Sequence, residues 1–336
     1  MSFKNLLIAL ILTLSAELFW RQPLADATSF SERPEVQKFV ADMASKHGFD
    51  IDSLTSLFAR ITPRPSAANT MTGQVVKPPS WTRYRSNFVN PWRISHGVSF
   101  WNDNAEALLR ARRTYGVPEE VIVAIIGVET RYGSYPLPYP VLDTLATLAF
   151  DYPRRGEFFR GELEQYLLLM REEGRDPSSL RGSFAGAMGI PQFMPSSYRA
   201  YAVDFDGDGH RNLWDNTTDA IGSVANYLKT YGWQAGQPIA MRAYLQPDAA
   251  SDLLTGTLKP EHSVVDLEAR GVKPAEPLAP ATQAALLAVD VEDGREYWLG
   301  MSNFYAITRY NRNLFYALAV YQLSQEIRLA RMVSLN

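Results

Sequence analysis

Residues 119–129 place the strongest constraint on the fold, because they form a helix-length segment with almost no polar side. They read Glu-Glu-Val-Ile-Val-Ala-Ile-Ile-Gly-Val-Glu, and the preceding Pro118 is well placed for a first helical turn. A helix that is apolar all round is stable only when other elements surround it. We therefore expect this helix to run through the core of a mainly α protein.

The remaining apolar periodicity predicts further helices and a small β portion. Helical spacing is found in several other segments: 28–60, 98–113, 157–173, 219–231 and 313–332. Residues 239–245 and 284–291 have the pattern of strands, and residues 291–295 have the composition of a hairpin turn. The proline-rich stretch 61–80 predicts an extended connection. The expected fold class is α+β, mainly α, with a small β-containing insertion.

The N-terminus has the pattern of a cleavable signal peptide at residues 1–27. Lys4 precedes an apolar run at 6–14, and Ala-Asp-Ala at 25–27 matches an A-x-A cleavage site. The run is too short to cross a bilayer, and a short buried helix is the alternative. We expect an exported protein.

We expect four parts after the signal peptide. They are a helical region with the proline-rich connection (28–115), a catalytic core with an acidic loop (116–236), a β-containing subdomain (237–310), and a C-terminal helix that returns to the core (311–336).

Composition excludes several classes of function. The chain has no cysteine, which excludes disulfides, thiolate metal sites, cysteine nucleophiles and a cysteine-linked lipid anchor. Its net charge is −3 at pH 7 and its pI is about 5.9, so it lacks the basic footprint of a nucleic-acid-binding protein. We expect no membrane anchor and no nucleic-acid partner.

Glu129 is the candidate catalytic residue, because it ends the apolar run of 119–129. Burial of a carboxyl group disfavours its charged form and raises its pKa. A carboxylic acid that keeps its proton near neutral pH can act as the general acid in glycoside cleavage. The alternative is a helix-ending glutamate paired with Arg131 or another arginine.

A loop at 182–195 is the second candidate for a functional segment. It reads Gly-Ser-Phe-Ala-Gly-Ala-Met-Gly-Ile-Pro-Gln-Phe-Met-Pro, and its small residues allow close approach of the backbone to a ligand or a helix. Ser183 and Gln192 are the polar groups that could bind a ligand there. A tightly packed structural loop is the alternative.

An acidic loop resembles the opening of an EF-hand. Asp204, Asp206 and Asp208 fit D-x-D-x-D-G, in which Gly209 permits the sharp turn and His210 offers a backbone carbonyl. This pattern predicts a structural cation site, with calcium favoured over magnesium because dedicated protein cages suit calcium better. A solvated acidic turn is the alternative.

Two motifs together resemble the lytic murein transglycosylase B family (glycoside hydrolase family 103). They are Val-Glu-Thr-Arg-Tyr-Gly at 128–133 and the loop at 182–195. Three further motifs extend the resemblance over roughly residues 35–325: Tyr-Pro-Arg-Arg-Gly-Glu at 152–157, Asn-Leu-Trp-Asp at 212–215 and Ile-Thr-Arg-Tyr-Asn at 307–311. The resemblance implies a lysozyme-like helical core with an α-helical N-terminal part.

The resemblance also implies roles for individual residues. Glu129 matches the single catalytic acid/base, Ser183 the serine that orients the N-acetyl group of the sugar, and Gln192 a second polar residue of the active site. Arg154 and Arg155 match a pair that contacts the glycan and its peptide. The residues that match the lining of the sugar subsites are Tyr227, Tyr310, Asn311 and Tyr316. Core packing is the alternative for each of these aromatic residues.

Two positions depart from the expected pattern. Phe158 stands where relatives are expected to have tyrosine, so a hydroxyl contact would be missing. Position twelve of the acidic loop is Asp215 in place of glutamate, whereas the resemblance points to Asp219 as the later metal ligand. The loop is expected to be one residue longer than in relatives, so both aspartates remain open.

The implied reaction is cleavage of the β-1,4 bond between N-acetylmuramic acid (MurNAc) and N-acetylglucosamine (GlcNAc) in peptidoglycan, with an intramolecular 1,6-anhydro product. Ordinary glycosidases use a second carboxylate. Its candidates here are supported by sequence proximity alone: Asp143, Asp151, Glu157 and Glu162. The alternatives are a hydrolytic lysozyme-type muramidase and a non-catalytic, calcium-stabilised glycan-binding protein.

The resemblance also bears on location and partners. Membrane-anchored relatives carry a lipidated cysteine after the signal sequence, and this chain has no cysteine. We expect a soluble periplasmic enzyme. Its expected partners are peptidoglycan glycan strands, with cell-wall synthases as a candidate class of protein partner.

Overall fold

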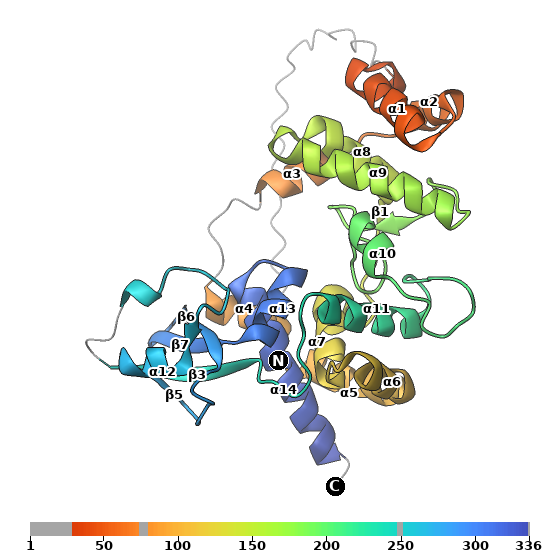
Figure 1. Ribbon diagram of the computed structural model, residues 1–336. Coiled ribbons are helices and arrows are strands. Elements are labelled where there is room, and N and C mark those ends of the chain that lie inside the picture. Colours follow the sequence, from red (N-terminus) through yellow and green to blue (C-terminus); the bar gives the residue numbers. More distant parts are fainter. Residues whose placement is uncertain (1–28, 74–79, 247–250, 335–336) are drawn as a thin grey trace, which may run out of the picture. The chain divides into compact units, whose positions relative to one another are not determined.

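The computed structural model describes residues 29–73, 80–246 and 251–334 (Figure 1). The predicted signal peptide at 1–27 therefore lies outside the described residues. The chain divides into two compact units between Arg60 and Ile61, and each unit is described by itself. None of the described helices is both long enough and apolar enough to span a membrane.

The first unit is a short helical assembly. Its described elements are η1 (Phe30–Glu32), α1 (Pro34–His47) and α2 (Ile51–Ala59). Gly48, with φ 67°, ends α1 in the left-handed conformation. The Asp50 side chain caps α2 by accepting a hydrogen bond from the Ser53 amide at 2.8 Å. The helical prediction for 28–60 is confirmed, as two separate helices.

Helix α7 (Glu119–Thr130) lies at the core of the second unit. Every residue from Val121 to Val128 is buried. Four helices pack against α7: α5 (Pro91–Asp103), α6 (Ala105–Tyr115), α11 (Thr217–Thr230) and α14 (Leu314–Ser334). The prediction that this apolar helix runs through the core is confirmed, because neighbours remove each of its sides from water.

A further group of helices in the second unit surrounds α9 (Gly156–Glu172). Helices α8 (Val141–Asp151) and α10 (Pro195–Tyr201) pack against α9, and α3 (Pro65–Gly73) packs against α8. Figure 1 shows α8 and α9 running side by side.

Helix α3 corrects the extended connection expected over 61–80, which is wrong for 65–73. Pro65 is the first helical residue, where its missing N–H costs no helical hydrogen bond. Arg64 holds the start of α3 on α8, since its guanidinium donates to Asp143 at 2.9 and 3.2 Å. Tertiary contacts thus stabilise a helix in a segment whose proline content predicts an extended chain.

The β portion is an antiparallel sheet with the strand order β4-β6-β7-β3-β5. Its strands are β3 (Ala240–Leu245), β4 (His262–Ser263), β5 (Val272–Pro274), β6 (Gln283–Val291) and β7 (Gly294–Gly300). Val291 pairs with Gly294 across the β6–β7 turn, which confirms the predicted hairpin. The strands predicted at 239–245 and 284–291 are also confirmed, as β3 and β6.

Short elements complete the second unit. They are α4 (Trp81–Phe88), β1 (Tyr139–Pro140), η2 (Pro153–Arg155), β2 (Arg181–Gly182), η3 (Ser251–Leu253), α12 (Val264–Ala269) and α13 (Ser302–Tyr310). Tyr139 in β1 pairs with Gly182 in β2. This pairing brings the start of the small-residue loop at 182–195 next to the start of α8.

Candidate active site

Glu129 lies on the last turn of α7 and is partly exposed. It lines a cavity of about 450 Å³, together with Phe88, Arg93, Arg131 and Tyr135 among others. The hydroxyl of Tyr316 in α14 donates a hydrogen bond of 2.7 Å to Oε1 of Glu129. The sequence-predicted acid is therefore at a cavity wall, where a ligand can reach it.

The pKa of Glu129 is raised from its ordinary value to about 7. Burial is the main cause, because it disfavours the carboxylate, and the Tyr316 hydrogen bond acts in the opposite direction. The raised pKa keeps the protonated form of Glu129 available near neutral pH, as a general acid requires.

The alternative of an arginine-paired Glu129 is not found in the described part of the chain. The Arg131 guanidinium lies over the Trp92 ring, 4.3 Å from its centroid. Arg93 donates to the backbone carbonyls of Gly127 at 3.1 Å and Asn87 at 2.5 Å. Both nearby arginines are thus engaged elsewhere, and no charge partner holds Glu129 in its ionised form.

The turn after α7 adopts an uncommon backbone conformation. Among the described residues other than glycine, positive φ is found at Arg131 (52°), Tyr132 (62°) and Gln192 (54°). All three lie in the segments that the sequence singled out. Left-handed conformations of such residues cost free energy and persist where the surrounding contacts enforce them. Here Thr130 Oγ1 donates to the Ile190 carbonyl at 2.7 Å, which ties this turn to the 182–195 loop.

The 182–195 loop is tightly packed. A Cβ atom on Gly182 would lie 2.3 Å from the Ala187 carbonyl oxygen, and one on Gly189 would lie 2.5 Å from that of Leu213. The Ser183 hydroxyl oxygen accepts hydrogen bonds from the amides of Ala185 at 3.3 Å and Ala187 at 3.1 Å. Both its lone pairs are thereby used, while no acceptor for its own proton is found among the described residues.

Three tyrosines connect this loop with Glu129. Tyr310 donates to the Pro191 carbonyl at 2.5 Å, and its ring lies parallel to that of Tyr316 at 6.4 Å between centroids. Tyr227 lies 4.8 Å from the Tyr310 ring and donates to the Arg309 carbonyl at 2.6 Å. Tyr227 and Tyr316 are buried, so part of their role is core packing, as the alternative stated.

The other predicted site residues are Gln192, Asn311, Arg154 and Arg155. Gln192 donates through Nε2 to the Gly189 carbonyl at 2.9 Å, within the loop. Asn311 is exposed and ends α13. Arg154 and Arg155 are exposed in η2, and the Arg155 guanidinium lies 4.1 Å from the Phe158 ring centroid. In the part of the chain that the structure describes, no contact joins either arginine to Glu129.

The sequence reasoning missed α4, which contributes Tyr84 and Phe88 to the surroundings of Glu129. Burial and the neighbouring Glu129 carboxylate raise the pKa of Tyr84 to about 12. The Tyr84 and Phe88 rings lie 4.9 Å apart. Aromatic residues at positions 81, 84 and 88 share a helical face, and that spacing was the available signal.

No second carboxylate is an electrostatic neighbour of Glu129 in the described residues. Asp143 is ion-paired with Arg64 at 2.9 Å. Glu162 accepts hydrogen bonds from the Ser196 amide at 2.9 Å and hydroxyl at 2.7 Å. Glu129 is therefore the one candidate catalytic carboxyl group at this site, whereas an ordinary glycosidase has a pair.

The acidic loop brings three carboxylates together. One oxygen from each of Asp204, Asp206 and Asp219 lies within 4.8 Å of the others. Calcium–oxygen distances of about 2.3–2.6 Å allow ligand atoms of one ion to be about 5 Å apart, so this group fits one calcium ion. Gly209 has φ 92°, which confirms its predicted role in the turn.

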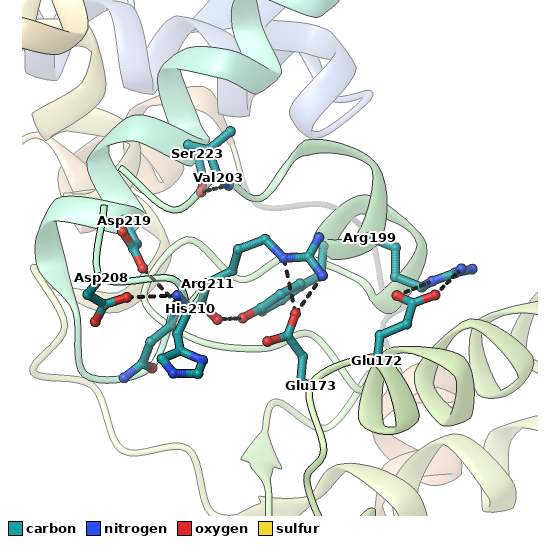
Figure 2. Close-up of polar contacts among 11 residues, drawn as sticks. Glu172, Glu173, Arg199, Val203, Asp208, His210, Arg211, Asp219 and Ser223 are labelled. Carbon is teal, nitrogen blue, oxygen red and sulfur yellow. Dashed lines mark hydrogen bonds and ion pairs between the residues drawn. The ribbon is translucent and has the colours of Figure 1, made fainter. Parts of the chain in front are cut away.

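Asp208 and Asp215 do not belong to this group of three. Asp208 accepts a hydrogen bond from the His210 amide at 2.8 Å (Figure 2). The loop is attached to α9 by Arg211, whose Nε donates to Glu173 at 3.0 Å. Asp219 on α11, and not Asp215, is the third member of the carboxylate group.

Comparisons with known proteins establish the family of the chain. The chain matches the family model described as Transglycosylase SLT domain over residues 31–325. It is 49% identical over 312 residues to the membrane-bound lytic murein transglycosylase B of Escherichia coli (strain K12), covering 90% of this chain and 85% of the relative.

Two solved structures are similar over nearly the whole chain. The catenated lytic transglycosylase SltB1 from Pseudomonas aeruginosa is 48% identical with a TM-score of 0.86, covering 90% of this chain and 99% of that chain. The Escherichia coli lytic transglycosylase Slt35 in complex with calcium is 49% identical with a TM-score of 0.83, covering 90% and 95%. The fold and the family match define a lysozyme-like enzyme with a mainly helical core. The chain belongs to the SLT-domain family of lytic transglycosylases, as the resemblance implied.

Proposed function

We propose that this protein is a peptidoglycan lytic transglycosylase that cleaves the MurNAc-β-1,4-GlcNAc bond and leaves 1,6-anhydro-MurNAc ends. The single observation that carries the proposal is the position of Glu129 in a cavity, with a pKa of about 7 and no second carboxylate among its electrostatic neighbours. Family membership supports the same reaction class.

Glu129 acts first as the acid and then as the base. Its proton passes to the glycosidic oxygen as the bond from that oxygen to C1 of MurNAc breaks. The resulting carboxylate then takes the proton of the MurNAc C6 hydroxyl, whose oxygen forms the new bond to C1. The Glu129 proton is restored and no water is consumed. A second carboxylate is unnecessary because the nucleophile belongs to the substrate.

Ser183 orients the acetamido group of the MurNAc residue. Its oxygen is occupied by two backbone amides, so its remaining hydrogen-bonding capacity is one donated proton. That proton can bind the acetamido oxygen and hold it near C1, where positive charge develops during cleavage. The two backbone bonds fix the position of the Ser183 hydroxyl before substrate arrives.

The remaining predicted residues bind the substrate. Tyr227, Tyr310, Asn311 and Tyr316 line sugar subsites, and Gln192 adds a polar contact from its strained position in the loop. Arg154 and Arg155 are exposed cations at the start of α9, suited to the carboxylates of a peptide attached to the glycan. Peptidoglycan is thus the substrate, and cell-wall synthases are the proposed class of protein partner.

The acidic loop holds a structural calcium ion. Asp204, Asp206 and Asp219 supply the carboxylates, and three like charges this close favour a cation between them. The hydrogen bond from the His210 amide to Oδ1 of Asp208 leaves the His210 carbonyl and Oδ2 of Asp208, the predicted further ligands, unused by that bond. The ion would join the loop to α11, and it takes no part in the chemical steps.

We also propose a location and an organisation for the chain. The N-terminal pattern and the absence of cysteine support export to the periplasm in soluble form. The catalytic core would comprise residues 116–236, preceded by the helical region 28–115 and followed by the β-containing subdomain 237–310 and the C-terminal helix 311–336.

Digestion of purified sacculi tests the reaction. Muropeptides released by the protein should carry anhydro ends, which are one water lighter than the reducing ends left by hydrolysis. Glu129→Gln should abolish release, whereas the matched control Glu268→Gln, at an exposed position on α12, should not. Reducing ends would establish a hydrolytic muramidase instead. Undiminished release by Glu129→Gln would refute the assignment of the acid.

A further inference from the structure

A second cavity, of about 480 Å³, lies where α4, the β6–β7 hairpin and α14 meet. Its walls include Arg85 of α4, Asp293 of the hairpin turn, Trp298 of β7 and Gln322 of α14. None of these residues lines the cavity that contains Glu129. Helix α4 contributes to both cavities, since its Phe88 lines the catalytic one.

Arg85 supplies a positive charge to this second cavity. Its Nε donates a hydrogen bond of 2.5 Å to Oε1 of Gln322, which holds the guanidinium in place. Within the described ranges, no carboxylate forms an ion pair with Arg85 and no acceptor binds its two terminal nitrogens. A held guanidinium with free terminal nitrogens matches the planar, two-oxygen geometry of a carboxylate.

The hairpin supplies negative charge to the same cavity. Glu292 and Asp293 line it and are exposed, and no cation in the described part of the chain pairs with either. Glu296 differs, because it is ion-paired with Arg242, whose guanidinium lies 5.1 Å from the Trp298 ring centroid. Unpaired charges of opposite sign therefore come from different walls of one cavity.

Trp298 adds a third, independent observation. Its side chain is buried, with the residue only 7% exposed, and its indole Nε1 has no hydrogen-bond partner among the described residues. A buried donor without an acceptor is costly and uncommon in folded proteins. The Trp298 indole therefore lines the cavity, while its N–H is enclosed behind the cavity wall.

We propose that this cavity binds a small zwitterion, an amino acid or short peptide with a free carboxylate and a free ammonium group. Arg85 binds the carboxylate, and Glu292 and Asp293 bind the ammonium group. The volume of about 480 Å³ is in the usual range for small-ligand sites.

Two kinds of molecule carry both a free carboxylate and a free ammonium group, a short peptide and a free amino acid. We propose that the ligand is the peptide. This assignment rests on the proposed function, since short peptides set free from peptidoglycan would carry both a free carboxylate and a free ammonium group.

Calorimetric titration of the full chain with D-alanyl-D-alanine tests the site. The dipeptide should bind, and its N-acetylated and C-amidated forms should bind at least about tenfold more weakly, since each lacks one charge-assisted contact. Arg85→Gln and the double variant Glu292→Gln/Asp293→Asn should weaken binding to a similar degree. The control Arg83→Gln, at an exposed α4 position outside the cavity, should change the Kd less than about twofold.

A second readout locates the ligand without relying on variants that alter charge. The indole N–H resonance of Trp298, assigned by its loss in Trp298→Phe, should shift on addition of the dipeptide, and should not shift with the N-acetylated, C-amidated form. No binding, equal binding of the blocked forms, or unchanged binding by both charge variants would overturn the proposal.

The source of the ligand and the proposed function are tested separately. Binding of D-alanyl-D-alanine at least about tenfold tighter than free D-alanine supports the peptide, whereas equal or weaker binding overturns that assignment. The catalytic proposal is tested by digestion of sacculi. Digestion without dipeptide binding would reject the site alone, and dipeptide binding without digestion would reject the catalytic function and the peptidoglycan source.

Discussion

Tyr316 donates a hydrogen bond of 2.7 Å to Glu129 although 187 residues separate them in the chain. Burial favours the protonated form of Glu129, whereas this hydrogen bond favours the carboxylate. The pKa of about 7 is the result of both influences. Such a balance suits a group that must release a proton in one step and recover it in another.

Tyr316→Phe should raise the pKa of Glu129 further, by about one unit, because the carboxylate loses its donor. The alkaline limb of the pH–rate profile should move to higher pH by the same amount, since Glu129 must be protonated to start the reaction. Muropeptide release measured from pH 5 to 9 checks this. Tyr305→Phe, on the partly exposed side of α13, is the control and should leave the profile in place. An unshifted limb in Tyr316→Phe would contradict the role given to the bond.

Glu129 should lower the stability of the protein at alkaline pH. Its folded-state pKa of about 7 lies above the ordinary value of 4.5, so the folded state binds the proton more tightly. The free energy of unfolding should therefore fall as pH rises from about 4.5 to about 7 and then level off.

Glu129→Gln should remove this pH-dependent loss. The variant should be more stable than the wild type at pH 8, by at most about 3 kcal/mol, and similar to it at pH 4. Denaturant unfolding at both pH values provides the measurement. A stability difference that is the same at pH 4 and pH 8 would show that the Glu129 pKa is not raised.

Gly127→Ala should destabilise the protein and reduce its activity. A Cβ atom on Gly127 would lie 2.6 Å from the Tyr132 ring, which cannot move freely because its hydroxyl donates to the Arg93 carbonyl at 2.6 Å. We expect a loss of about 1–3 kcal/mol in the free energy of unfolding.

Gly161→Ala is a matched control for this substitution. Gly161 is also helical, but a Cβ atom added there would have no other atom within 4 Å. Alanine at this position should stabilise the protein by about 0.5–1 kcal/mol. Equal effects of the two substitutions would mean that Tyr132 does not constrain Gly127.

Calcium should raise the melting temperature of the wild-type protein, and EDTA should lower it, because an ion bound only by the folded state stabilises that state. Asp219→Asn and Asp204→Asn should abolish the calcium-dependent shift. Asp42→Asn, at a partly exposed aspartate of α1 outside the acidic loop, should retain it. A melting temperature insensitive to calcium and EDTA would exclude the metal site.

Local patterns in the sequence were sufficient for much of the fold and part of the site. The continuous apolar run identified α7, and alternation with a turn signal identified the β6–β7 hairpin. The spacing of Asp204, Asp206 and Gly209 identified the acidic loop. These features depend on residues close in sequence, whose mutual geometry is set by the period of a helix, a strand or a turn.

Other features required the tertiary structure. Helix α3 forms within a proline-rich segment because Arg64 is bound to Asp143 of α8 and α3 packs against α8. The choice of Asp219 over Asp215 depends on where α11 begins relative to the acidic loop. Neither outcome has a local signal, because each depends on packing between separate elements.

The sequence by itself identified the candidate acid, through the position of Glu129 at the end of an apolar helix. Only the tertiary structure decided its chemical environment, by bringing Tyr316 from α14 and Tyr84 from α4 close to the same carboxyl group. The pKa of a buried carboxyl group depends on the groups around it in space. Those groups come from elements distant in the chain, which only the packing of α4, α7 and α14 brings together.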